Sequence, residues 1–235
     1  MNFKKNITLK YSGWELNFFD NAKVFRNYQF NFIRKHIKGN VCEVGPGNGI
    51  ICDKYIHLSK KITLFEKSEK TYPILSEKYK HNKNIRVFNE YFKPSKEKFD
   101  SIIYLDVLEH IKNPTKEIKN AIGNLSQKGK LIISVPAYQH LFSQFDKDVG
   151  HYRRYTIKSF LMQLNDTKYS NLDYHYIDSC GYFVSLASKL LSKKSYKSNF
   201  KLKIFIWNFL VHFSKVLDFF TFYTFGKSLV IIISK

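Results

Sequence analysis

The sequence predicts an α/β fold with a doubly wound, seven-stranded and mostly parallel sheet. Short apolar segments alternate with longer mixed segments of helix length, which is the pattern of βαβ units. The first apolar segment runs directly into a glycine-rich loop, as strands do at the ligand-binding edge of such sheets. With 235 residues, 44% of them hydrophobic, the chain can bury the core of one such domain and an added segment.

Seven segments have the length and the apolar composition of strands. Helix-length segments such as 113–125 separate the first five, and the other two come late in the chain. The seven are residues 40–44, 62–65, 85–88, 101–105, 130–135, 172–177 and 228–233. Parallel strands joined by helices place their C-terminal ends at one edge of the sheet, so we expect a ligand to bind there.

Two parts of the chain lie outside this alternation. Residues 14–38 have broad apolar spacing typical of a helix and precede the first strand, where they could cover the ligand site. The last two strands are separated by an insert in which 204–225 is rich in aromatic residues. The expected organisation is a helical cap (1–39), a core (40–177), an aromatic helical insert that is a substrate lid or faces a membrane (178–226), and the final strand (227–235).

The insert predicts an amphipathic helix rather than a membrane span. Asn208, His212, Lys215 and Asp218 fall on one helical stripe, and charges are costly inside a bilayer. A wide apolar face preceded by several lysines suits a helix that lies in the interface of an anionic membrane. The alternatives are that this face packs on the domain as ordinary core, or on a second subunit in a homodimer.

The formal charge of +20 is consistent with an anionic partner or with a lysine-rich solvated surface. Nucleic acid is not favoured as the partner, because the basic residues are spread out and no RNA-binding module is recognisable. Cys42, Cys52 and Cys180 are odd in number and lack metal-ligand spacing, so neither a disulfide framework nor a zinc site is expected. The first residues lack the apolar region of a signal peptide, so we expect a cytoplasmic protein, at most peripheral on the inner face of the membrane.

Gly45, Gly47 and Gly49 follow the first predicted strand at every second position. Glycine tolerates positive φ and lets a backbone approach a ligand closely. Position 50 is isoleucine instead of the small residue that ends a G-x-G-x-x-G loop, and the Lys-Ser/Thr of a P-loop is absent. What remains is E-x-G-x-G-x-G, starting at Glu43. Glu66, at the end of the second strand, is placed to accept hydrogen bonds from ribose hydroxyls.

These residues resemble the first motif of the class I S-adenosylmethionine-dependent methyltransferases. YLDVLEHI at 104–111 is similar to the VLEH signature of their small-molecule branch. VPA…LFS…D…GHYRRYT at 135–156 resembles a bacterial subfamily associated with cell-envelope glycan or lipid-linked metabolism. The resemblance implies a Rossmann-like methyltransferase fold with S-adenosyl-L-methionine as cofactor and no metal. It implies cofactor contacts from Glu43, Gly45, Gly47, Gly49, Glu66 and Asp106, and from Asn89 or Glu90, between which the choice is open.

The loop after the fifth strand carries the groups expected to meet the acceptor. His151 is the first candidate for a general base, with Asp146 or Asp148 orienting it, and His140 is the second. Arg153 and Arg154 could clamp a carboxylate or phosphate. His110 is expected to be a buried structural histidine.

The expected function is O-methylation of a small hydroxy or acid acceptor, such as a cell-envelope glycan or a lipid-linked compound. A quinone-type O-methyltransferase and a non-catalytic scaffold that binds S-adenosylmethionine or a membrane are the alternatives. An RNA methyltransferase is disfavoured, for the reasons given above for nucleic acid.

Overall fold

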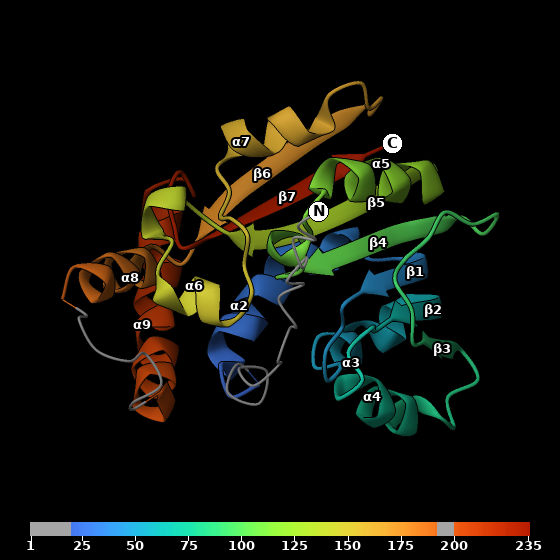
Figure 1. Ribbon diagram of the computed structural model, residues 1–235, viewed down its shortest axis with the longest axis horizontal. Coiled ribbons are helices and arrows are strands. Elements are labelled where there is room, and N and C mark those ends of the chain that lie inside the picture. Colours follow the sequence, from blue (N-terminus) through green and yellow to red (C-terminus); the bar gives the residue numbers. More distant parts are fainter. Residues whose placement is uncertain (1–19, 192–199) are drawn as a thin grey trace, which may run out of the picture.

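The computed structural model describes residues 20–191 and 200–235, so the part of the predicted cap that contains Trp14 and Phe18 lies outside the described residues. A seven-stranded sheet has the order β3-β2-β1-β4-β5-β7-β6 (Figure 1). The strands are β1 (Gly39–Val44), β2 (Ser59–Phe65), β3 (Ile85–Phe88), β4 (Phe99–Leu105), β5 (Leu125–Pro136), β6 (Asn171–Ile177) and β7 (Ser228–Ser234). All seven predicted strands are therefore present, with ends shifted by a few residues.

The first five strands are parallel to their neighbours, whereas β7 runs antiparallel to both β5 and β6. The final strand thus inserts between β5 and β6 instead of adding to an edge. This places the beginning of β7 at the same end of the sheet as the C-terminal end of β5, where Pro136 pairs with Ser228.

Helices cover both faces of the sheet (Figure 1). They are α2 (Lys23–Ile33), α3 (Cys52–Tyr55), α4 (Thr71–Tyr79), α5 (Pro114–Asn124), α6 (Gln144–Asp148), α7 (Ile157–Leu161), α8 (Ser179–Leu191) and α9 (Phe200–Phe220). Short 3₁₀ turns are η1 (Arg34–His36), η2 (Ile56–Leu58), η3 (Leu108–His110), η4 (Gln139–Leu141) and η5 (Met162–Leu164). Alternate strand residues face opposite sides, so Ile103 packs towards α2 and α3 while Ile102 packs towards α5 and α7.

Local capping signals decide where two of the predicted helices begin. Asn113 accepts a hydrogen bond from the backbone N–H of Lys116, and Pro114 occupies the first turn of α5. Thr156 caps α7 by accepting from the backbone N–H of Ser159. Glu109 lies in η3, ahead of the Asn113-Pro114 signal that starts α5.

The insert forms α8 and α9, and two residues of the predicted polar stripe, Asn208 and Asp218, face the protein, whereas His212 is exposed. Asn208 accepts from the backbone N–H of Val24 and donates to Asn21 O, which ties α9 to the start of α2. Asp218 is fully buried, whereas Phe205, Phe209 and Phe219 on the other face are exposed. The expectation that the apolar face packs wholly as core is therefore not met within this chain. None of the described helices is long and apolar enough to cross a membrane.

Candidate active site

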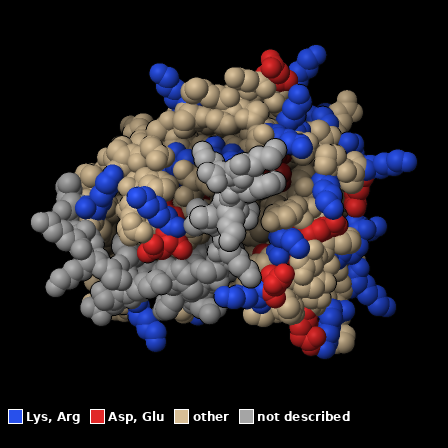
Figure 2. All heavy atoms as spheres, in the orientation of Figure 1, with Lys and Arg blue, Asp and Glu red and all other residues tan. Residues whose placement is uncertain are grey.

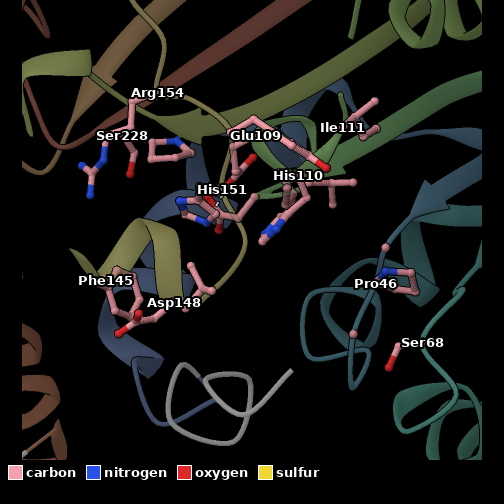
Figure 3. Close-up of a pocket in the computed structure, with 18 of the residues that line it drawn as sticks. Pro46, Ser68, Glu109, His110, Ile111, Phe145, Asp148, His151, Arg154 and Ser228 are labelled. Carbon is pink, nitrogen blue, oxygen red and sulfur yellow. Dashed lines mark ion pairs between the residues drawn. The ribbon is translucent and has the colours of Figure 1, made fainter. Parts of the chain in front are cut away.

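A cleft of about 1710 Å³ opens at the C-terminal ends of the parallel strands. It lies beside the switch point of the sheet, between β1 and β4, where the strand order reverses. This is where a doubly wound sheet binds its ligand. One wall comes from the loops after β1 and β2, and the opposite wall from η3, α6, α8, α9 and the residues before β7. Figure 3 shows Pro46 and Ser68 across the cleft from Glu109, His151 and Arg154.

Two of the three predicted glycines lie in the cleft wall. Gly45 has φ +67°, and a Cβ there would come within 2.7 Å of Val107 Cγ2. Gly47 has φ +57° and also lines the cleft. Gly49 packs away from it, where a Cβ would meet the Tyr79 hydroxyl at 2.6 Å. The first two glycines therefore bring backbone to the cleft wall, and the third lets α4 approach the loop.

Glu66 is placed to bind a ligand, and it also organises the glycine loop. Its Oε2 accepts from the backbone N–H of Gly47 at 3.0 Å, and its Oε1 accepts from that of Ser68 at 2.8 Å. Each carboxylate oxygen keeps further acceptor capacity on the cleft side, which suits a pair of ribose hydroxyls. Burial raises the pKa of Glu66, and the two backbone hydrogen bonds oppose that shift.

Glu43 forms the floor of the cleft beneath this loop. It is 2% exposed, and its Oε2 accepts from the Tyr55 hydroxyl. Burial raises the pKa of Glu43 from 4.5 to about 7, against the opposing effect of the Tyr55 hydrogen bond.

Asp106 ends β4 with φ +57° and is ion-paired with Arg26 of α2 at 2.7 Å. The helix α2, which precedes the first strand, lines the cleft through Phe25 and Arg26. Of the two residues after β3, Glu90 lines the cleft and Asn89 does not. Of Asn89 and Glu90, the geometry therefore favours Glu90 as the candidate for cofactor contact.

At the far end of the cleft, Asp146 holds His151 and Arg154 together. His151 Nδ1 lies 2.8 Å from Asp146 Oδ1, while Arg154 donates from Nε at 2.8 Å and from Nη2 at 3.0 Å. Burial alone would raise the pKa of Asp146, but the His151 hydrogen bond and the Arg154 charge outweigh it and hold the pKa well below its usual range. The ring of His151 is thereby fixed with Nε2 directed towards Glu109, 3.9 Å away.

The other predicted acceptor residues are placed less centrally. Asp148 lines the cleft, and its Oδ1 accepts from Gln144 instead of from His151. Arg153 donates to Lys112 O and does not line the cleft, so of the predicted arginine pair only Arg154 reaches it. His140 is exposed beside Tyr182 and lies outside the cleft wall.

The sequence analysis missed Glu109 and Lys227 as site residues. Glu109 is fully buried in the cleft wall, and burial together with the nearby Asp106 raises its pKa well above the usual range. The sequence feature that could have indicated Glu109 is a carboxylate between the apolar residues Leu108 and Ile111. Lys227 lines the cleft with its ammonium 3.7 Å from the centre of the Trp207 ring, a contact that no local pattern indicates. His110 is half-buried, and desolvation and the neighbouring His151 lower its pKa to about 3.

Comparison with known proteins is consistent with this geometry. Residues 17–178 match the family model described as a methyltransferase domain. No curated protein matches the sequence. Among solved structures, the N-methyltransferase NodS from Bradyrhizobium japonicum, in complex with S-adenosyl-L-homocysteine, is 11% identical with a TM-score of 0.55, covering 97% of this chain and 94% of that one.

Two further structures share the fold. A possible histamine N-methyltransferase from Thermotoga maritima is 14% identical with a TM-score of 0.62, covering 93% of each chain. Phosphoethanolamine N-methyltransferase 2 from Haemonchus contortus is 12% identical with a TM-score of 0.62, covering 96% of this chain and 59% of that one. The chain therefore belongs to the methyltransferase domain family, which confirms the resemblance to the class I S-adenosylmethionine-dependent methyltransferases noted in its sequence.

Proposed function

We propose that this protein transfers a methyl group from S-adenosylmethionine to an oxygen atom of a small-molecule acceptor that carries an anionic group. The observation that carries the proposal is the distribution of charge along the cleft. Carboxylates of Glu43, Glu66 and Asp106 lie around the glycine loop. The opposite wall presents the cations Arg154, Lys189, Lys203 and Lys227, which outnumber the carboxyl groups of Glu109 and Asp148 there.

Lys227 supports the anionic acceptor most directly. Burial lowers the pKa of its ammonium group to about 8, so the lysine is still mostly charged at neutral pH. Its side chain packs on Trp207 and forms no ion pair with any described carboxylate. A partly desolvated ammonium group of this kind gains by pairing with a carboxylate or phosphate. Arg154 adds a second donor, because its Nη1 is buried without a hydrogen-bond partner among the described residues.

The cofactor would occupy the acidic half of the cleft. Gly45 and Gly47 would bring backbone against it, Glu66 would accept from its ribose hydroxyls, and Asp106 would face its positively charged end. When bound, the cofactor supplies a methyl group already activated on a sulfonium. The protein then has to align the acceptor and exclude water. His151, held by Asp146, is placed to accept the proton of an acceptor hydroxyl.

Nitrogen is the alternative acceptor atom, since the similar structures named above are N-methyltransferases. Their identity of 11–14% supports a common fold and carries no argument about the acceptor. Incubating the protein with [methyl-¹³C]S-adenosylmethionine and small-molecule extracts would decide this, because the carbon chemical shift separates O-methyl from N-methyl products. Separate polar and lipid extracts would distinguish a glycan-type acceptor from a quinone-type one. Cofactor binding without any labelled product would favour the scaffold alternative.

We also propose that α9 rests on an anionic membrane surface. Its outer face exposes Phe205 by 72%, Phe209 by 60% and Phe220 by 70%. Lys201 and Lys203 lie exposed in the first turns of the same helix, where they suit anionic headgroups. The inner face of this helix lines the cleft through Ile204 and Trp207. A lipid-linked acceptor could therefore reach the cleft from the membrane, and a second copy of the chain is the alternative occupant of this face.

The distribution of basic residues supports binding to a membrane surface better than binding to a nucleic acid. Lys and Arg side chains are dispersed over the face shown in Figure 2, without a single contiguous patch. Nucleic-acid binding usually depends on such a patch or stripe.

A further inference from the structure

Three side chains at the acceptor end of the cleft have the donor set of a metal site. They belong to Glu109, His110 and His151, and one ligand atom from each lies within 4.8 Å of the others. The first two come from η3, directly after β4, and the third comes from the loop after α6. All three line the cleft, and Figure 3 shows them converging on the side opposite Pro46.

Glu109 is the observation that points to a ligand. Its side chain is 0% exposed, and neither Oε1 nor Oε2 has a hydrogen-bond partner among the described residues. The 3.9 Å between Oε1 and His151 Nε2 is too long for a hydrogen bond. Buried carboxylates are normally paired, hydrogen-bonded or bound to a metal. Among the described residues the only such partner of Glu109 is His151, at 3.9 Å, and neither carboxylate oxygen accepts a hydrogen bond.

His151 is already oriented in the way that metal-bound histidines are. Asp146 binds its Nδ1, and Arg154 in turn fixes Asp146 with two hydrogen bonds. This leaves Nε2 as the nitrogen that faces Glu109. A carboxylate behind a ligating histidine fixes the ring and increases its basicity as a ligand. The ring of His110 stands nearly perpendicular to that of His151, with 4.6 Å between their centres.

We propose that Glu109, His110 and His151 bind one divalent transition-metal ion, of the class of Zn²⁺, Co²⁺ or Mn²⁺. One carboxylate and two imidazoles suit these ions, whereas Mg²⁺ and Ca²⁺ prefer oxygen ligands. Ligands held at about 2.0–2.2 Å from one ion lie roughly 3 Å apart. The three ligand atoms lie within 4.8 Å of one another, so the farthest pair needs to close by up to about 2 Å. Three protein ligands leave positions of the ion open towards the cleft.

The catalytic role of the ion rests on the proposed function, whereas the binding itself does not. Bound to an open position, an acceptor hydroxyl would have a lower pKa and would lose its proton to water more readily. His151 would then act as a ligand instead of accepting the proton directly. Sequence spacing predicted no metal, because His151 is far from Glu109 along the chain and only the fold brings the two together.

Titrating the full-length, chelator-treated protein with Co²⁺ tests the proposal through visible absorption and calorimetry. We expect one ion per chain, competition by Zn²⁺, and no competition by equimolar Mg²⁺. Glu109→Gln and His151→Asn should each weaken binding at least about 100-fold, and Asp146→Asn about 10- to 100-fold. His81→Ala, which removes an exposed histidine outside the cleft, is the matched control and should bind as the wild type does.

Wild-type protein that binds no more Co²⁺ than the Glu109→Gln and His151→Asn variants would overturn the proposal. Binding of S-adenosylhomocysteine, measured on every variant, shows that each is folded. The same measurement separates the two proposals. Methyl transfer that persists in metal-free protein would exclude the catalytic role of the ion and leave the proposed function standing. Wild-type protein that binds Co²⁺ but not S-adenosylhomocysteine would exclude the proposed function and leave the metal site standing.

Discussion

The Tyr28 hydroxyl donates a 2.8 Å hydrogen bond to Oδ2 of Asp218, joining the helix before the first strand to the helix before the last. Asp218 also accepts from the backbone N–H groups of Asp178 and Ser179. This buried carboxylate therefore holds the inner face of α9 against the domain. Because the polar side of α9 is used in this way, its phenylalanines remain on the outside.

Removing this contact should lower stability without affecting the cleft wall. We expect Tyr28→Phe to reduce the free energy of unfolding by about 1–3 kcal/mol, because it leaves a buried carboxylate with one donor fewer. Urea denaturation measures the change. Tyr169→Phe, on a half-exposed side chain, is the control and should change stability by less than about 0.5 kcal/mol. Equal effects of the two substitutions would contradict the role given to Asp218.

Glu66 should govern cofactor affinity. We expect Glu66→Ala to weaken S-adenosylhomocysteine binding roughly 10- to 100-fold, because charged hydrogen bonds to the ligand are lost and Gly47 loses its acceptor. Glu66→Gln keeps one acceptor oxygen, so its affinity for S-adenosylhomocysteine should lie between those of the wild type and Glu66→Ala. Calorimetry measures both, with the exposed Glu77→Gln as the unaffected control. Normal affinity in Glu66→Ala would exclude the ribose contact.

Glu43 should make stability depend on pH. Its pKa is 4.5 in the unfolded chain and about 7 when buried, so the folded protein binds the proton more tightly. The free energy of unfolding should therefore fall as pH rises through this interval, by on the order of 3 kcal/mol from this group. Glu43→Gln keeps an acceptor for Tyr55 and should remove that part of the slope.

Urea denaturation at about pH 5 and about pH 8 compares the two proteins, and other titrating groups contribute equally to both. The Glu43→Gln variant should gain on the wild type as pH rises. Parallel pH profiles would show that Glu43 does not titrate in this range.

The exposed face of α9 should bind anionic vesicles. We expect the wild-type protein to float with phosphatidylglycerol vesicles at low salt and less at high salt, since Lys201 and Lys203 contribute. Replacing Phe205, Phe209 and Phe213 by serine should abolish flotation and leave stability nearly unchanged, because these side chains are already exposed.

Ile74→Ser removes an exposed apolar side chain from α4 and serves as the control. A protein that does not float but changes from dimer to monomer on the triple substitution would instead assign this face to a second copy. Light scattering after gel filtration makes that distinction.

Local pattern alone was enough to predict the seven strands, the glycine loop and the helix that corresponds to α5. These features depend on residues close together in the chain: apolar alternation, glycines that permit positive φ, and side chains that cap the next turn. Periodicity likewise showed that α9 has a polar stripe.

Tertiary structure decided which groups meet. Periodicity cannot say whether a polar residue of α9 faces water or protein. Here the hydrogen bond from Tyr28 holds Asp218 against the domain. The choice of Asp146 over Asp148 beside His151 depends on how α6 is seated against Arg154. Glu109 meets His151, and Lys227 meets Trp207, only because distant segments converge at one edge of the sheet. The sequence alone thus determined a methyltransferase fold and its cofactor loop, and the packing of distant elements determined the acceptor end of the cleft.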